Sequence, residues 1–290
     1  MGYIDAIILG AIQGLTEFLP VSSSGHLLIA RDFLELPLVG TLTFDAVLQC
    51  ATVLAVLVYF ARDLWGIVFS ALRYVTRKPV SEKEKTYLWA IILGTIPAIV
   101  FGLLLESKMD SVFRNVHLVA LALLAGSALM YYAQKMSRVT LGNPSPTSEV
   151  GENHVEKTSP CSGVGECRGL TVKKGIIIGF FQSLALVPGI SRSGATISGG
   201  LLAGFSREEA TRFSFLLSVP ILVGSGLKKL LEVDFTASGT ILGPLFIASS
   251  FAFFIGLLAI HYFIKYLKTH TLSVFIWYRV LLAIAIFMFL

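Results

Sequence analysis

The sequence predicts an all-α integral membrane protein: an inverted-topology repeat with about six full transmembrane helices and two re-entrant helical hairpins. Three observations predict this class. Hydrophobic residues make up 55% of the 290 residues and charged residues only 14%, whereas an average soluble domain carries roughly a quarter charged residues. Several apolar runs approach the ~20 residues that cross a bilayer as a helix. Two further apolar runs stop halfway, and their sequences resemble each other.

Six apolar runs are long enough to cross a hydrocarbon core about 30 Å thick as helices. They comprise residues 44–59, 88–105, 116–132, 213–231, 242–264 and 272–290. A shorter apolar stretch, residues 64–74, is expected to form a helix at the membrane interface.

Two other apolar runs, residues 4–19 and 175–187, end in polar, helix-breaking sequence. The first continues into Pro20 and Ser22-Ser23-Ser24-Gly25-His26, and the second into Pro188-Gly189 and Ser191-Arg192-Ser193-Gly194. Irregular backbone at membrane depth persists only where it is buried in protein or lines a wet cavity. Both runs are therefore predicted to be re-entrant hairpins.

These two hairpins match each other at one constant offset in residue number, here called the repeat offset. Eight identities fall in a nineteen-residue window without a gap: Ile7/Ile176, Ile8/Ile177, Gly10/Gly179, Gln13/Gln182, Leu15/Leu184, Ser22/Ser191, Ser24/Ser193 and Gly25/Gly194. Three full crossings separate the copies, so the second must enter from the opposite face of the membrane. The predicted organisation is a first membrane repeat (1–135), a polar cytoplasmic linker (136–172) and a second, inverted repeat (173–290).

The distribution of Lys and Arg predicts the orientation. Sixteen of them fall in loops 61–87, 133–174, 206–212 and 265–271, and five fall in the loops on the other face. This positive-inside bias places both termini outside the cytoplasm, with the first hairpin opening outward. The net charge of +5 indicates contact with anionic membrane lipids rather than with nucleic acid.

Arg192 and Arg279 are the two cations that this layout places at membrane depth, where a charge is costly and usually functional or paired. Arg192 has hydroxyls and glycines around it, which suit an anion because a guanidinium grips phosphate bidentately and glycine lets the backbone approach. The predicted phosphate-binding residues of this loop are Gly189, Ser191, Ser193, Gly194 and Thr196. The alternative is an arginine paired with a structural carboxylate. Arg279 is interpreted as a structural or lipid-facing anchor.

Glu17 is the carboxylate of the first hairpin, and it lies four residues after Gln13, on the same helix face. It is a candidate ligand for a divalent cation, a candidate base and a candidate partner of Arg192. His26 is a candidate nucleophile or proton shuttle, and Asp45 and Gln49 are weaker candidates for supporting roles. A Glu, a His, an Arg and several hydroxyls are typical of phosphoryl hydrolysis, here on a lipid-borne phosphate.

The chain resembles the undecaprenyl-diphosphate phosphatase family, the bacitracin-resistance proteins of bacterial cell-wall synthesis. The resemblance covers nearly the whole chain and depends on two long motifs, residues 13–26 (QGLTEFLPVSSSGH) and residues 188–196 (PGISRSGAT). It implies hydrolysis of undecaprenyl diphosphate to undecaprenyl phosphate and inorganic phosphate, aided by a divalent cation, Mg²⁺ or Ca²⁺. It also implies a site in the plasma membrane that opens toward the outer or periplasmic face.

The resemblance assigns catalytic positions to Glu17, His26, Arg192 and Ser23. Gln13 and Ser24 join the phosphate-loop residues in the predicted substrate site, and Glu17 is the predicted metal ligand. Some family members have Glu at the first position of the acidic motif, where this chain has Gln13. The nucleophile stays open between Ser23, His26 and an activated water.

The main alternative is a secondary transporter or flippase of a lipid-linked or inorganic phosphate, because inverted repeats with broken helices are typical of transporters. A purely structural membrane subunit does not explain an intramembrane Glu and Arg. Phosphate release by detergent-purified protein separates enzyme from transporter. The oligomeric state is left open, with a homodimer as one candidate.

Overall fold

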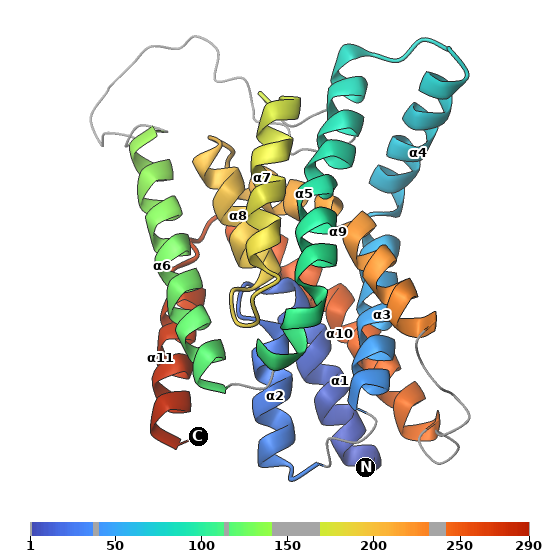
Figure 1. Ribbon diagram of the computed structural model, residues 1–290. Coiled ribbons are helices and arrows are strands. Elements are labelled where there is room, and N and C mark those ends of the chain that lie inside the picture. The colour runs from blue at the N-terminus through green and yellow to red at the C-terminus, as the bar shows by residue number, and fades with distance from the viewer. Residues whose placement is uncertain (1, 37–40, 113–115, 141–168, 232–241, 290) are drawn as a thin grey trace.

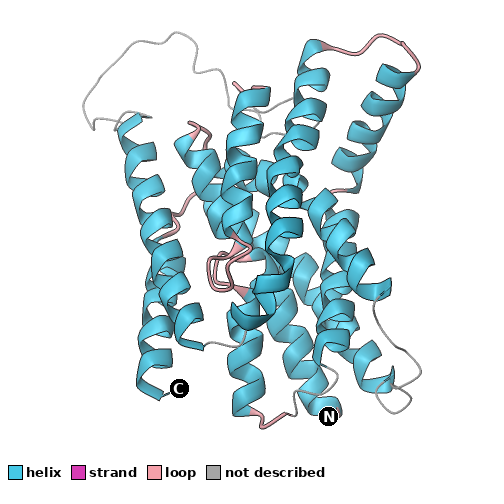
Figure 2. Cartoon of the chain, in the orientation of Figure 1, coloured by secondary structure: helices cyan, strands magenta, loops and turns pink. Residues whose placement is uncertain are grey.

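The computed structural model describes residues 2–36, 41–112, 116–140, 169–231 and 242–289, and these residues form helices without any strand (Figures 1 and 2). The helices within these ranges are α1 (Tyr3–Phe18), α2 (Ser23–Phe33), α3 (Thr41–Tyr59), α4 (Ala61–Val75), α5 (Glu82–Val112), α6 (Val116–Thr140), α7 (Val172–Leu184), α8 (Arg192–Leu202), α9 (Arg207–Leu231), α10 (Leu242–Leu267) and α11 (Ser273–Phe289). The predicted all-helical class is confirmed.

Four helices, α5, α6, α9 and α10, are long and apolar enough to cross a membrane. A fifth candidate is the pair α3–α4, which is bent by 78° at Phe60. Helix α11 is apolar but has only 17 residues. By length and composition, the described residues therefore hold four spans, or five if the bent pair is one span, where about six were predicted. The separate helix predicted at residues 64–74 is α4.

Helix–helix packing depends on glycines in the first helix of each hairpin. A Cβ added at Gly10 of α1 would lie 2.2 Å from the carbonyl oxygen of Ala248 in α10. A Cβ at Gly179 of α7 would lie 1.9 Å from the carbonyl oxygen of Gly94 in α5. Small residues let helix backbones touch, which is how helices associate in lipid. Each first helix is thus packed closely against one long helix.

The two helix–break–helix units match at most of their boundaries, although α7 ends earlier in the repeat, at Leu184, than α1 does at Phe18. The starts of α1 and α7 are separated by the repeat offset, and so are both the starts and the ends of α2 and α8. Figure 1 shows α1 starting at the end of the molecule that carries the N-terminus, whereas α7 starts at the opposite end. Their breaks lie near the middle of the molecule, so the polar residues of both breaks meet deep inside the helical bundle.

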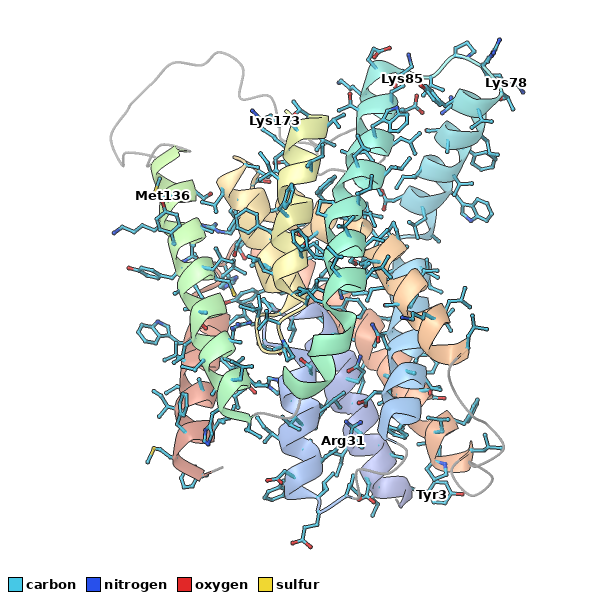
Figure 3. The ribbon with its side chains drawn as sticks, viewed as in Figure 1. Tyr3, Arg31, Lys78, Lys85, Met136 and Lys173 are labelled. Carbon is cyan, nitrogen blue, oxygen red and sulfur yellow. The ribbon has the colours of Figure 1, made fainter. Side chains whose placement is uncertain are left out.

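Both chain termini lie at the same end of the molecule in Figure 1. Figure 3 shows Lys78, Lys85 and Lys173 at the other end, away from Tyr3 and Arg31. Of the predicted linker, residues 136–140 belong to α6 and residue 172 begins α7, and residues 141–168 lie outside the described residues. The boundaries of the three predicted regions stay a prediction.

Candidate functional site

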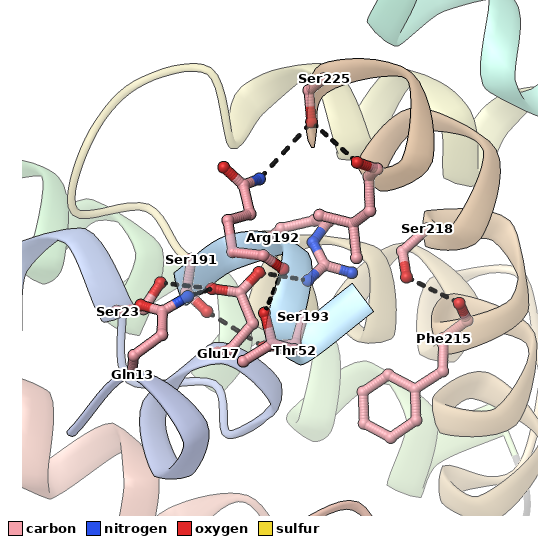
Figure 4. Close-up of polar contacts among 12 residues, drawn as sticks. Gln13, Glu17, Ser23, Thr52, Ser191, Arg192, Ser193, Phe215, Ser218 and Ser225 are labelled. Carbon is pink, nitrogen blue, oxygen red and sulfur yellow. Dashed lines mark hydrogen bonds and ion pairs between the residues drawn. The ribbon is translucent and has the colours of Figure 1, made fainter. Parts of the chain in front are cut away.

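The breaks of the two hairpins meet at the carboxylate of Glu17 (Figure 4). Arg192 donates from Nη2 to Glu17 Oε1 at 2.9 Å. Ser23 donates from Oγ to Glu17 Oε2 at 2.8 Å, and Gln13 donates from Nε2 to the same oxygen at 3.1 Å. The side chains of Glu17 and Arg192 are only 10% and 13% exposed. Four predicted site residues therefore form one largely buried network.

Each break turns through a serine whose backbone lies in a sparsely populated region. Ser22 has φ 75° and Ser191 has φ 70°, and such a conformation in a non-glycine residue costs about 1–3 kcal/mol. Each of these serines is the N-cap residue of the helix that follows, α2 or α8. The first residue of each helix, Ser23 or Arg192, then contacts Glu17, and both positive helix ends point into the site.

Hydroxyl groups are paired in the same way in both breaks. The Oγ atoms of Ser22 and Ser24 are 3.3 Å apart, and those of Ser191 and Ser193 are 3.2 Å apart. Ser193 also donates to the carbonyl oxygen of Leu19 at 3.1 Å, which joins the second break to the first. Three of these hydroxyls, those of Ser24, Ser191 and Ser193, belong to the predicted phosphate-binding residues, and Ser22 does not.

The remaining predicted residues of the second break act mainly on its backbone. Thr196 donates its hydroxyl to the carbonyl oxygen of Arg192 at 2.8 Å, and the Gly194 amide donates to Ser191 Oγ at 3.3 Å. Gly189 has φ +101°, and a Cβ there would lie 2.5 Å from the carbonyl oxygen of Val119. Only glycine tolerates both conditions, so Gly189 is required for the path of the loop.

Arg279 in α11 holds the two breaks together. Its side chain is fully buried, and it donates to the carbonyl oxygens of Pro20 at 3.2 Å and Gly189 at 2.9 Å. Two further acceptors, Leu123 O and Ser127 Oγ, lie on α6. The lipid-facing interpretation of Arg279 is wrong, because its guanidinium satisfies backbone carbonyls that the irregular loops leave without helical partners. The structural interpretation holds.

His26 lies on the first turn of α2, and both of its ring nitrogens are engaged. Nδ1 is 2.7 Å from the carbonyl oxygen of Ser22, and Nε2 is 2.6 Å from the hydroxyl of Tyr278. A carbonyl only accepts, so Nδ1 carries the hydrogen and Nε2 of the neutral ring accepts from Tyr278. The two rings are also stacked, with centroids 5.6 Å apart. Sequence reasoning missed Tyr278, because nothing local to it indicates a histidine near the other end of the chain.

The two weaker candidates have partners of their own. Asp45 forms an ion pair with Arg31, whose Nη1 lies 2.8 Å from Asp45 Oδ2. Gln49 donates to Ser225 at 3.4 Å, which links α3 to α9. The printed contacts of Asp45 and Gln49 therefore join neither residue to the Glu17 network.

The described residues contain no cluster of three or more His, Cys, Asp or Glu side chains that could hold a metal ion. Glu17 is the one carboxylate of the network described above, and it already accepts hydrogen bonds from Gln13, Ser23 and Arg192. These side chains do not make a metal-binding cage. A divalent cation bound here would take most of its ligands from substrate and water.

Long apolar helices around a largely buried cluster of a carboxylate, an arginine and hydroxyls define a multi-pass membrane protein with a polar site in its interior. The family model described as "Bacitracin resistance protein BacA" matches residues 6–285. The chain belongs to this family.

Three curated relatives, each named undecaprenyl-diphosphatase, illustrate the similarity. The protein of Arthrobacter sp. (strain FB24) is 37% identical, over 100% of this chain and 94% of the relative. The protein of Micrococcus luteus is 39% identical, over 99% of this chain and 96% of the relative. The protein of Chloroherpeton thalassium is 39% identical, over 98% of this chain and 95% of the relative.

Proposed function

We propose that this chain is a membrane phosphatase that hydrolyses undecaprenyl diphosphate to undecaprenyl phosphate and inorganic phosphate. It thereby recycles the lipid carrier of cell-wall synthesis and confers bacitracin resistance. The observation that carries this proposal is the Glu17 carboxylate, which is bonded to a serine hydroxyl at 2.8 Å and to an arginine at 2.9 Å. Nucleophile, base and phosphate ligand are thus in direct contact, within a family whose curated members carry this activity as their name.

Substrate binding changes the partner of Arg192. In the described state its guanidinium is bonded to Glu17, which occupies the place that an incoming phosphate oxygen would take. A diphosphate offers more charge and bidentate geometry, so it competes well for the guanidinium. Once Arg192 turns to the phosphate, Glu17 retains Ser23 and Gln13 and becomes the stronger base.

The chemical step follows from the contact between Ser23 and Glu17. Ser23 Oγ attacks the terminal phosphorus while its proton passes to Glu17, and the phosphoanhydride bond breaks to release undecaprenyl phosphate. Arg192 and the amides that begin α2 and α8 stabilise the charge on the transferring phosphoryl group. Water then hydrolyses the phosphoserine and releases inorganic phosphate. His26 is the less suitable nucleophile, because Tyr278 occupies Nε2.

We also propose a divalent cation, Mg²⁺ or Ca²⁺, in a restricted role, with a single protein ligand. It would enter bound to the diphosphate oxygens, with Glu17 as its protein ligand and water completing its shell. Its chemistry there is to neutralise phosphate charge. The side chains present support this restricted role, because Glu17 is the single carboxylate of the network and the neutral Gln13 adds no negative charge.

The membrane arrangement proposed is an inverted repeat with α1–α2 and α7–α8 as re-entrant hairpins, in the bacterial plasma membrane. The boundaries that match at the repeat offset and the opposite directions of α1 and α7 support it. The excess of Lys and Arg in the predicted cytoplasmic loops supports a site open to the outer face. The orientation is tested with two single-cysteine variants in a cysteine-free background, Asp32→Cys and Lys78→Cys. A thiol reagent added outside the cell should label Asp32→Cys and should not label Lys78→Cys.

Phosphate release from undecaprenyl diphosphate by detergent-purified protein tests the function, since no compartments exist there. Release that requires Glu17 and Arg192 is expected. A complete lack of release, with phosphate transport by the same protein in vesicles, would identify a transporter instead. The homodimer stays a prediction, and sedimentation of the protein in detergent tests it.

A further inference from the structure

Gln182 of α7 is a buried amide without a partner. The residue is 3% exposed, and neither Nε2 nor Oε1 makes a hydrogen bond within the part of the chain that the structure describes. Among the described residues it is the one side chain with two such atoms. Leaving a buried amide unpaired is unfavourable, so such groups in native proteins usually indicate a ligand or a water.

The first hairpin shows what an amide at this position can do. Gln13 holds the place in α1 that Gln182 holds in α7, since the repeat offset separates both the two residues and the starts of their helices. Gln13 is equally buried, but it has a partner in Glu17 at 3.1 Å. The residue at the position of Glu17 in the second hairpin is Leu186. Leu186 lies beyond the end of α7 at Leu184, so the second hairpin offers Gln182 no carboxylate at the corresponding sequence position.

The second donor to Glu17 also has a counterpart. Ser23 begins α2 and donates to the same Oε2 atom as Gln13. The residue that begins α8, at the corresponding position of the second hairpin, is Arg192. In the first half, then, two donors converge on one carboxylate oxygen. In the second half the corresponding donors are a free amide and a guanidinium, and the carboxylate between them is missing.

We infer that Gln182 is a substrate-binding residue, and that a phosphate oxygen of the lipid diphosphate takes the place of this missing carboxylate. Gln182 Nε2 donates to that oxygen together with Arg192, and Oε1 accepts from a water or from a protonated phosphate oxygen. This inference rests on the proposed function. It adds one protein group that binds the phosphate, the Gln182 amide, which neither the sequence motifs nor the ion pair of Glu17 and Arg192 identifies.

The experiment compares wild type with Gln182→Leu, and uses Gln134→Leu as the matched control. Gln134 is also buried, but it is satisfied: Nε2 donates to Ser273 at 3.1 Å and Oε1 accepts from the Leu272 amide at 2.7 Å. Three quantities are measured in detergent: the Tm without ligand, the rise in Tm caused by methylenediphosphonate, and KM and kcat for undecaprenyl diphosphate.

For Gln182→Leu we expect a Tm without ligand equal to or above that of wild type, because an unpaired polar group has been removed. We expect a smaller rise in Tm with methylenediphosphonate and a KM raised about tenfold or more, as for the loss of a hydrogen bond to a charged group. Gln134→Leu should show the reverse, with a lower Tm and an unchanged KM. Only a ligand-binding role produces higher stability together with weaker binding.

A lower Tm with an unchanged KM would overturn the inference, because it would show that Gln182 holds an internal water. An unchanged Tm and an unchanged KM would overturn it as well. Either result in an active wild type leaves the proposed function intact. Failure of the wild type itself to release phosphate would instead remove the proposed function.

Discussion

The carbonyl oxygens of Pro20 and Gly189, which occupy the same position of the two breaks, accept hydrogen bonds from one guanidinium, that of Arg279. The distances are 3.2 Å and 2.9 Å. A single buried cation on the last helix thus fixes both loops that carry the site. The relative position of Glu17 and Arg192 depends on a residue that contacts neither of them through its side chain.

Substitution of Arg279 should therefore affect stability and activity together. Arg279→Lys keeps the charge but replaces the guanidinium fork with a single ammonium, which cannot donate to acceptors on both breaks and on α6 at once. We expect a loss of about 2–4 kcal/mol in unfolding free energy, because buried carbonyls are left unpaired. Turnover should fall at least tenfold. Thermal unfolding in detergent and the phosphatase assay measure the two effects. Wild-type stability in Arg279→Lys would contradict this role.

Gly126→Ala tests the contacts of Arg279 without substituting the arginine itself. A Cβ at Gly126 would lie 2.2 Å from Arg279 Nη2 and 2.8 Å from the carbonyl oxygen of Ile190. The guanidinium must shift, so both breaks should loosen. We expect a clear loss of Tm and of turnover in this otherwise conservative change. Gly224→Ala, where a Cβ meets nothing within 4 Å, is the control and should behave as wild type.

The ion pair of Glu17 and Arg192 gives the sharpest prediction for activity. Arg192→Ala should abolish turnover, with a loss of about three orders of magnitude or more, because the cation that binds the phosphate is removed. Arg192→Lys should retain only part of the wild-type turnover, since an ammonium cannot bind a phosphate bidentately. Glu17→Gln should lose the base and keep the fold. Retained activity in Arg192→Ala would remove this residue from the site.

A covalent mechanism predicts a phosphoenzyme. Wild type quenched during turnover with labelled substrate should carry phosphate on Ser23, and Ser23→Ala should carry none. His26→Ala should still form the intermediate, because Ser23 contacts Glu17 and His26 contacts Tyr278. Peptide mapping of the labelled protein makes the distinction. Label that disappears only in His26→Ala would assign the attack to the histidine.

Tyr278→Phe separates the hydrogen bond to His26 from the ring contact. The stacked ring is kept and the hydroxyl at 2.6 Å from Nε2 is lost. We expect a loss of about 1 kcal/mol in stability, the usual net value of one hydrogen bond, and turnover within about threefold of wild type. Thermal unfolding and kcat measure these effects. A hundredfold loss of kcat would show that Tyr278 and His26 take part in proton transfer.

The sequence by itself determined the class of protein, because hydropathy alone decides which segments can enter a bilayer. It also predicted the two breaks, because proline, glycine and serine follow one another closely there and together disfavour a continuous helix. All six predicted spans coincide with helices, α3, α5, α6, α9, α10 and α11, of which α11 is short and α3 counts as a span only together with α4. The pairing of Glu17 with Arg192 was open in the sequence, and the structure shows it.

Only the tertiary structure decided how the site is held together. The bend of 78° between α3 and α4 is a feature of the fold that hydropathy does not describe. Arg279 and Tyr278, near one end of the chain, contact Pro20 and His26 near the other, and no local pattern encodes such a pairing. The unpaired amide of Gln182 is visible only when every possible partner has been placed. Every residue has the same backbone carbonyl, so the sequence does not indicate which group will donate to a carbonyl that lacks a helical partner. The tertiary structure decides that partner.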